Sequence, residues 1–338
     1  MRLVPLLALI LLAAGGGETP KRQEARDLPA FLGPLRPVPV PDDNPMSDAK
    51  VELGRMLYYD PRLSGNGTIS CASCHNPALG WSDGLAKGIG MNGQKLGRSS
   101  PTVLNAAYYE TQFWDGRAPS LEEQAKGPIQ AASEMGGEAA KATKTVAAIP
   151  GYASRFKEVF DGEVTFDRIA KAIAAFERTV VDLDSPFDRW ARGNDKAMSE
   201  AQIRGFEVFT GKGRCATCHS GPLFADKRYH NIALGDPDEG RFAVSKDPKE
   251  TGAFRTPTLR NIALTGPYMH NGSLRTLREV IDHYEKTSNE KDKHPNMSIF
   301  NLPFKLDDAE KKDLEAFLHA LTGDKRDPRA AVIPVLPQ

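Results

Sequence analysis

Cysteine and histidine occur together in a spacing that could carry redox chemistry. The pattern Cys-X-X-Cys-His occurs at residues 71–75 and again at residues 215–219, and these two copies account for all four cysteines of the chain. Two thiols at this spacing can each add to a vinyl group of a haem, and the adjacent histidine can then bind the haem iron. The sequence therefore predicts two covalently bound haems c. The expected attachment and iron-binding residues are Cys71, Cys74 and His75 for the first haem and Cys215, Cys218 and His219 for the second.

Two other chemistries also use paired cysteines. A Cys-X-X-Cys pair can contribute to a structural zinc site, or it can form a reversible disulfide as in thioredoxin-like proteins. Neither needs a histidine directly after the second cysteine, whereas haem attachment does. His75 and His219 therefore favour haem over both alternatives.

The first 17 residues are typical of a secretory signal peptide. Arg2 is followed by an almost wholly apolar run over residues 3–14 and then by small residues. The run is shorter than the roughly 20 residues that a membrane-spanning helix needs, although an uncleaved N-terminal anchor is an alternative. We expect residues 1–17 to be a signal peptide, and the mature protein to be periplasmic without a membrane span.

Length and charge limit the domain number and the partners. The chain has 338 residues, a net charge of zero and an isoelectric point near 7.1, which gives no reason to expect nucleic acid or an anionic membrane as a partner. After the signal peptide, the length suits two domains of ordinary size. The expected parts are a proline-rich extended lead-in at 18–47, an N-terminal haem domain at 48–188, a C-terminal haem domain at 189–326 and a tail at 327–338.

The regular structure is expected to be helical. Three segments carry a capping-box signature, in which Ser or Thr is followed three residues later by Glu or Gln. They start at Ser120, Ser199 and Thr276. Apolar residues recur at helical spacing over residues 167–181 and 306–321, and the alternation typical of strands is almost absent. Two all-α domains of the class I cytochrome c type are the simplest interpretation.

Six short strings, in order along the chain, resemble those of the bacterial dihaem cytochrome c peroxidases and the related MauG-type enzymes. They lie at residues 100–105, 112–118, 123–128, 134–135, 256–261 and 267–272. Each string alone is a weak match, but together they span most of the mature chain. The resemblance implies that peroxide reacts at the first haem, in a peroxidatic N-terminal domain, and that the second haem takes electrons in.

The same resemblance implies roles for three further residues. Gln124 and Glu134 match residues of the pocket in which peroxide reacts. A carboxylate there could take the proton from one peroxide oxygen and deliver it to the other, so Glu134 is the candidate proton shuttle and Gln124 would orient peroxide. Trp114 matches a residue between the haems. From composition alone, Gln124 and Glu134 would be solvated side chains, and Trp114 would be an ordinary core residue.

Two positions depart from the pattern of typical peroxidases. Many of these enzymes have a distal histidine ligand on the loop after the first haem, where this chain has Met91. A thioether is a poor ligand for ferric iron, so we expect an open or weakly occupied sixth position that needs no reductive activation. At the second haem, Tyr284 replaces the usual methionine and points to the MauG-like branch, because a phenolate stabilises ferric iron. The rival ligands there are His283, Met269 and Met297.

The resemblance further implies a calcium ion between the domains. Thr265 and Pro267 match residues whose backbone carbonyls bind this ion, and Ser99 replaces the usual asparagine ligand. Calcium prefers six or more oxygen ligands, so backbone oxygens and water would have to complete the set. Family members are often dimers, so a homodimer is a further expectation.

Three functions are compatible with these features. The first is a peroxidase that reduces hydrogen peroxide to water with electrons from a small cytochrome c or cupredoxin. The second is a MauG-like enzyme that uses peroxide to oxidise Tyr or Trp residues of a partner protein, although residues 211–214 lack a tryptophan that would support the outward electron route. The third is a non-catalytic dihaem electron carrier, which would not need Gln124 and Glu134. The sequence favours the first function.

Overall fold

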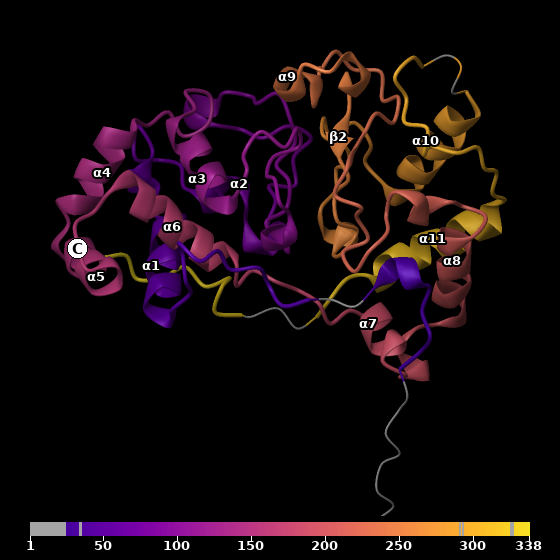
Figure 1. Cartoon of the computed structure of the whole chain (residues 1–338), viewed down its shortest axis with the longest axis horizontal. Coiled ribbons are helices and arrows are strands. Elements are labelled where there is room, and N and C mark those ends of the chain that lie inside the picture. The colour runs from indigo at the N-terminus through magenta and orange to yellow at the C-terminus, as the bar shows by residue number, and fades with distance from the viewer. Residues whose placement is uncertain (1–24, 34–35, 291, 293, 325–327) are drawn as a thin grey trace, which may run out of the picture.

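The structure, a computed structural model, describes residues 25–33, 36–290, 292, 294–324 and 328–338. Two helical domains lie side by side (Figure 1). The expected signal peptide at 1–17 lies outside the described residues. None of the helices that the described residues form is both long and apolar enough to cross a membrane.

The N-terminal domain is built around the crossing of its first and last helices, α1 and α6. Ser47 and Thr165 cap the first turns of these two helices with their side chains. At the crossing, a Cβ atom on Gly54 would lie 1.8 Å from the carbonyl oxygen of Ala172, so only glycine allows this close approach. The helices of this domain are α1 (Asp48–Tyr59), α2 (Cys71–Cys74), α3 (Leu121–Gln130), α4 (Ala139–Ala147), α5 (Pro150–Phe160) and α6 (Phe166–Glu177).

The C-terminal domain repeats this arrangement with α8 and α11. A Cβ atom on Gly205 of α8 would lie 1.9 Å from the carbonyl oxygen of Asp313 on α11. The helices are α7 (Pro186–Ala191), α8 (Glu200–Thr210), α9 (Phe242–Ser245), α10 (Leu277–Asn289) and α11 (Asp308–Ala320). In the part of the chain that the structure describes, the only strands are β1 (Tyr229–His230) and β2 (Phe254–Arg255), which pair antiparallel with Tyr229 opposite Arg255.

Single turns of 3-10 helix shape the long loops that follow each haem motif. These loops, at residues 76–101 and 220–257, bring side chains from distant parts of the chain to the two motifs. The turns within these loops are η3 (Pro77–Leu79), η4 (Met91–Gly93) and η8 (Pro248–Glu250). Further 3-10 turns of the described residues lie elsewhere: η1 (Ala30–Leu32), η2 (Pro61–Leu63), η5 (Ala106–Tyr108), η6 (Asp195–Ala197), η7 (Cys215–Thr217) and η9 (Ile262–Leu264).

Each domain has its own hydrophobic core. The first core includes Leu57 and Phe176 from the α1–α6 crossing, and Val180 is its last member before the second domain begins. The second core begins with Phe187 in that part of the chain and includes Phe317 of α11. The cores therefore divide between residues 180 and 187, whereas the boundary expected from the sequence, at 188, lies inside α7.

The lead-in and the tail both pack on the haem domains. Leu32 is buried in the C-terminal core, whereas the carbonyl of Pro39 accepts a hydrogen bond from Arg178 in the N-terminal domain at 3.3 Å. The lead-in therefore crosses from one domain to the other, as Figure 1 shows. In the tail, the carbonyl of Ala330 accepts a hydrogen bond from the Tyr59 hydroxyl at 2.8 Å.

The helices expected from the sequence are confirmed. α3, α8 and α10 begin directly after Ser120, Ser199 and Thr276, and each of these side chains accepts a hydrogen bond from the backbone N–H three residues later. The capping box is reciprocal at α8 and α10, but at α3 the Glu123 side chain pairs with Lys126 instead. The all-α expectation is confirmed apart from the short β1–β2 ladder.

Candidate functional site

Each Cys-X-X-Cys-His motif lines its own cavity. The cavity of the N-terminal domain, which we call the first cavity, has a volume of about 1670 Å³ including the space at its mouth. The second cavity, in the C-terminal domain, has a volume of about 1880 Å³ measured in the same way. The four cysteines are free thiols. Cys71, Cys74 and His75 line the first cavity, and Cys215, Cys218 and His219 line the second.

Both motif histidines are half-buried and favour the neutral form, which is the form that binds a metal. Burial lowers the pKa of His219 to about 4 and also lowers the pKa of His75. Nδ1 of His219 lies 2.9 Å from the carbonyl oxygen of Phe224, a contact that places the proton on Nδ1 and leaves Nε2 for iron. Nδ1 of His75 has no hydrogen-bond partner of normal geometry among the described residues, although the backbone of Trp81 and Pro101 lies close.

A shared wall separates the two cavities. Trp114 is part of this wall, and its Nε1 donates a hydrogen bond to the carbonyl of Ser99 at 2.9 Å. The carbonyl of Trp114 in turn accepts a hydrogen bond from the backbone N–H of Arg255 at 2.8 Å. The indole is therefore fixed between the two cavities. The residues that line both cavities are Ser99, Ser100, Pro101, Thr102, Ala106, Trp114 and Arg255.

Arg255 tests whether the cavities suit haem. Its guanidinium lies 3.7 Å from the ring centre of Tyr109 and donates to the carbonyl of Thr111 at 2.7 Å, and its burial lowers its pKa. Its Nε is buried and has no partner in the part of the chain that the structure describes. A buried cation needs an anion nearby, and haem carries carboxylate side chains. The free thiols, the neutral imidazoles and this cation together fit covalent haem on both sides of the wall.

Gln124 and Glu134 line the first cavity together with the first haem motif. Gln124 lies in α3, and Glu134 lies in the turn that follows this helix. Burial raises the pKa of Glu134, and the positive charge of Arg117 opposes the rise. This carboxyl group is therefore easier to protonate than an ordinary surface carboxyl, which suits a group that must both accept and release a proton.

The candidate ligands of the second haem separate into two groups. Tyr284, which projects from α10, and Met269 both line the second cavity, and burial raises the pKa of the Tyr284 hydroxyl. Nε2 of His283 instead lies 3.0 Å from the carbonyl oxygen of Ile232. Met297 lines a surface depression next to this cavity. Ligation by Tyr284 stays a prediction.

Met91 lies on the loop after the first motif, beside the first cavity rather than among its described lining residues. Its Sδ packs against Gly136, 3.0 Å from the position that a Cβ atom would occupy there. Its backbone N–H donates a hydrogen bond to the carbonyl of Glu134 at 2.7 Å. Met91 therefore helps to fix the backbone of Glu134, and iron ligation by its sulfur stays a prediction.

The expected calcium ligands lie at the second cavity. Ser99, Thr265 and Pro267 all line it, and the carbonyl of Ser99 already accepts the indole N–H of Trp114. No group of three or more acidic, His or Cys side chains surrounds these residues in the described part of the chain. Calcium prefers six to eight oxygen ligands that include carboxylates, so this donor set fits it poorly. Calcium stays a prediction, and no step of the chemistry below depends on it.

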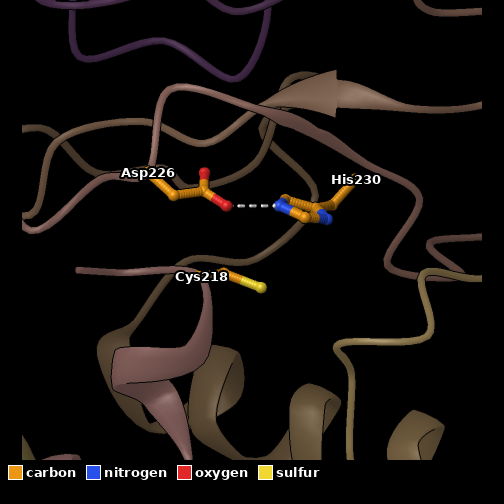
Figure 2. A group of neighbouring side chains, drawn as sticks. All are labelled: Cys218, Asp226 and His230. Carbon is orange, nitrogen blue, oxygen red and sulfur yellow. Dashed lines mark hydrogen bonds and ion pairs between the residues drawn. The ribbon is translucent and has the colours of Figure 1, made fainter. Parts of the chain in front are cut away.

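One cluster of metal-ligand residue types does occur, beside the second haem motif (Figure 2). Ligand atoms of Cys218, Asp226 and His230 lie within 4.8 Å of one another. The Asp226 carboxylate is 2.8 Å from Nε2 of His230, and Nδ1 of the same ring is 2.8 Å from the hydroxyl of Ser298. Because both ring nitrogens are engaged and the Cys218 thiol is needed for haem, this cluster is an internal hydrogen-bond chain.

Fold and site together define a class: a two-domain c-type cytochrome with one haem cavity in each domain and a buried carboxyl group beside the first. Residues 48–196 match the family model described as di-haem cytochrome c peroxidase, and residues 202–322 match that of cytochrome c.

Several known proteins are similar over most of the chain. The methylamine utilization protein MauG of Methylorubrum extorquens is 44% identical over 305 residues, which cover 89% of this chain and 85% of that protein. The cytochrome-c peroxidase IdrP1 of Denitromonas iodatirespirans is 40% identical over 326 residues, covering 86% of each. The crystal structure of a MauG-like protein associated with microbial copper homeostasis has a TM-score of 0.82 and 35% identity, covering 91% of this chain and 98% of that one.

The chain therefore belongs to the family of dihaem cytochrome c peroxidases and MauG proteins. This confirms the family indicated by the sequence motifs. It also makes the chain an oxidoreductase of the peroxidase type with two haem c domains.

Two buried charged residues at the cavities were missed by the sequence analysis. One is Arg255 in the shared wall. The other is Glu177, which lines the first cavity at the end of α6. Its Oε2 has no partner among the described residues, and burial raises its pKa to about 8. A signal existed for Glu177, because it directly follows the apolar run that ends at Phe176 on the buried face of α6.

Proposed function

We propose that this protein is a dihaem peroxidase that reduces hydrogen peroxide to water, using electrons delivered singly by a small periplasmic redox protein. One observation carries the proposal: Gln124 and Glu134 line the same cavity as Cys71, Cys74 and His75. A carrier of electrons alone would have no use for a half-buried carboxyl group and an amide at that place.

The chemistry of the first cavity follows from these side chains. Haem bound by His75 would supply electrons to the O–O bond. Glu134 takes the proton from one peroxide oxygen and delivers it to the other, which leaves as water. The amide of Gln124 donates a hydrogen bond that orients peroxide. Two electrons and two further protons convert each hydrogen peroxide molecule into two molecules of water.

The shared wall supplies the route for these electrons. Trp114 lines both cavities, and hydrogen bonds at its indole N–H and its carbonyl fix its position. An aromatic ring held between two redox centres can help electrons to cross from the second cavity to the first. We assign this role to Trp114 and the electron-entry role to the haem of His219.

A MauG-like function is the second candidate, and Tyr284 is the observation that favours it. A phenol in the second cavity would stabilise ferric iron and lower its potential relative to a methionine ligand. A low potential suits a haem that helps to store oxidising equivalents and withdraws electrons from Tyr or Trp residues of a partner protein. A relative that is 44% identical is named MauG.

Three further assignments belong to the proposal. The periplasm is the expected location, because residues 1–17 have the composition of a signal peptide. Hydrogen peroxide and a cytochrome c or cupredoxin are the expected partners. Tyr284 is the proposed sixth ligand of the second haem, and the iron of the first haem is left open to peroxide.

Sequential mixing separates these functions. The air-oxidised holoprotein is mixed with hydrogen peroxide in a stopped-flow spectrometer, and a reduced small cytochrome c is added in a second step. A fast change of the haem spectrum followed by turnover of the cytochrome supports the peroxidase. A spectral change that persists and ignores the cytochrome supports the MauG-like function. If the protein did not react with peroxide at all, the result would support a non-catalytic electron carrier.

A further inference from the structure

A basic depression lies on the surface of the C-terminal domain, close to the second haem motif. We use the name basic depression for the surface hollow whose lining includes three cations, one carboxylate and two apolar side chains: Lys227, Arg228, Lys249, Glu250, Ile299 and Phe300. The side chain of Ile299 is 82% exposed and that of Phe300 is 38% exposed, although both are large and apolar. An exposed apolar centre with charged residues around it is typical of a protein-binding surface.

The basic depression connects directly to the second cavity. Phe300, His230 and Ser298 line both of them. The ring of His230 contacts the ring of Phe300 edge-on, with 5.7 Å between the ring centres. On its other side, as Figure 2 shows, His230 and its partner Asp226 lie beside Cys218, which is expected to hold the edge of the second haem. His230 therefore lies between Phe300 on this surface and the thiol that is expected to hold the second haem.

The depression carries a surplus of positive charge. Lys227, Arg228 and Lys249 are exposed, and none of them forms an ion pair with the residues that the structure describes. The acidic groups closest to them are engaged elsewhere, because Asp226 binds His230 at 2.8 Å and Glu250 lies 3.8 Å from Arg241. One exposed carboxylate, Asp247, remains beside Lys249 and binds its backbone N–H at 3.0 Å. Since the whole chain has no net charge, this surplus is local.

We propose that the basic depression is the docking surface for an acidic redox protein, and that electrons enter the second haem through it. The inference rests on the proposed function and adds the charge of the electron donor to it. A partner that fits carries carboxylates around an apolar patch at its own redox centre, so that the patch covers Ile299 and Phe300.

Electrostatics makes the proposal measurable. Opposite charges on two docking surfaces steer the encounter and raise association rates by about 10 to 10³-fold. The effect weakens as salt is added, because the screening length falls to about 10 Å at 0.1 M ionic strength. An acidic donor should therefore reduce this protein faster at low salt than at high salt, and a basic donor of similar potential should show the opposite trend.

The test uses the holoprotein and two reduced small c-type cytochromes of similar potential, one of net negative and one of net positive charge. The rate constant for reduction of the second haem is measured against ionic strength. We expect the double variant Lys227→Glu, Lys249→Glu to lower the rate with the acidic donor by roughly tenfold or more and to raise it with the basic donor. The matched control is Lys144→Glu, Lys157→Glu on α4 and α5, which changes the same total charge on exposed residues of the other domain.

The possible outcomes distinguish failure of the docking surface from failure of the proposed function. Equal rates with both donors, or an equal loss in the control variant, would overturn the docking surface. Circular dichroism and haem spectra report whether the double variant is folded. Peroxide reduction by the unmodified holoprotein with hydroquinone, a small uncharged reductant, tests the proposed function separately. If hydroquinone supports turnover while the acidic cytochrome does not, the peroxidase stands and the docking surface is wrong.

Discussion

The carboxyl groups of Glu123 and Glu134 are close along the chain but lie in different surroundings. Glu123 is exposed on α3 and pairs with Lys126 at 2.6 Å, whereas Glu134 lines the first cavity, where burial raises its pKa. Of these two groups, only Glu134 can exchange a proton with a molecule bound at the first haem. We predict that Glu134→Gln slows the reaction of the oxidised holoprotein with peroxide by roughly 10² to 10⁴-fold, measured by stopped-flow absorbance.

Glu123→Gln provides the matched control for that prediction. It makes the same chemical change on the neighbouring helix but outside the cavity, so the rate with peroxide should stay at the parental value. A Glu134→Gln variant that reacts as fast as its parent would remove Glu134 from the mechanism.

Glu177 gives a prediction about stability against pH. Burial raises the pKa of this carboxyl group to about 8 in the folded protein, whereas its ordinary value of 4.5 applies in the unfolded chain. Unfolding therefore releases a proton between these pH values, and the contribution of Glu177 to stability falls as the pH rises. We predict that Glu177→Gln is more stable than its parent at pH 8 by on the order of a few kcal/mol. The advantage should shrink towards pH 4.5.

Denaturant unfolding of both holoproteins at several pH values measures this difference. Glu123→Gln again serves as control and should show no such trend. If the difference in the free energy of unfolding between Glu177→Gln and its parent stayed constant with pH, Glu177 would have to be ionised in the folded protein.

Tyr284 gives a prediction about redox potential. If its phenol binds the second haem, replacing it by a thioether ligand removes a group that stabilises ferric iron. We predict that Tyr284→Met raises the midpoint potential of the second haem by on the order of 0.1 V or more. Spectroelectrochemical titration measures the potential. His283→Gln is the control, because the His283 ring contacts the carbonyl of Ile232 and not the second cavity. If His283→Gln changed the midpoint potential of the second haem and Tyr284→Met did not, His283 would be the ligand instead.

At the residue scale, the sequence was informative where chemistry needs local spacing. Both haem motifs could be recognised because their cysteines and histidine are adjacent, and the family strings supplied Gln124 and Glu134. Arg255 could not be recognised, because its burial depends on segments far away in the chain. The guanidinium of Arg255, for example, is positioned by Tyr109 and Thr111 of the other domain.

At the scale of elements, the two domains share one packing feature, a glycine at the crossing of two helices. Gly54 and Gly205 each let a helix approach the backbone of the last helix of its domain, and a Cβ atom would meet a carbonyl oxygen at 1.8 and 1.9 Å respectively. Overpacking of this kind costs roughly 1–3 kcal/mol. We predict that Gly205→Ala destabilises the C-terminal domain by this amount even though alanine favours helix formation, measured by denaturant unfolding.

Glu207→Ala is the control for the helix crossing. Glu207 is exposed on the same helix, α8, so this variant should unfold like its parent. If Gly205→Ala were as stable as its parent, the crossing of α8 and α11 would have to be looser than the structure shows.

Helix positions were predictable where caps or apolar spacing marked them. α10 follows this rule because Thr276 caps it, and α11 (Asp308–Ala320) lies within the apolar repeat at residues 306–321. The β1–β2 ladder was not predictable, because two-residue strands have no periodicity. The end of α6 at Glu177 was placed four residues too late, at 181, because apolar residues continue beyond the helix to Val180, which packs in the core without being helical.

At the scale of the whole molecule, the contact between the domains creates the redox unit. Arg98 from the N-terminal domain binds Asp238 of the C-terminal domain at 2.7 Å, next to its own partner Asp115 at 2.6 Å. These contacts lie beside the wall that contains Trp114. The sequence predicted two domains of the correct type, but it could not show that one wall lines both cavities, because that wall joins loops from both domains.

The stoichiometry of turnover tests the central claim most directly. Holoprotein is supplied anaerobically with an excess of reduced small cytochrome c, and known amounts of hydrogen peroxide are added while the oxidised cytochrome is counted by absorbance. We predict that two cytochrome molecules are oxidised for each peroxide consumed, and that this turnover is lost in step with peroxide reactivity in Glu134→Gln. Peroxide that disappears without oxidising the cytochrome, or cytochrome that stays reduced throughout, would contradict the account.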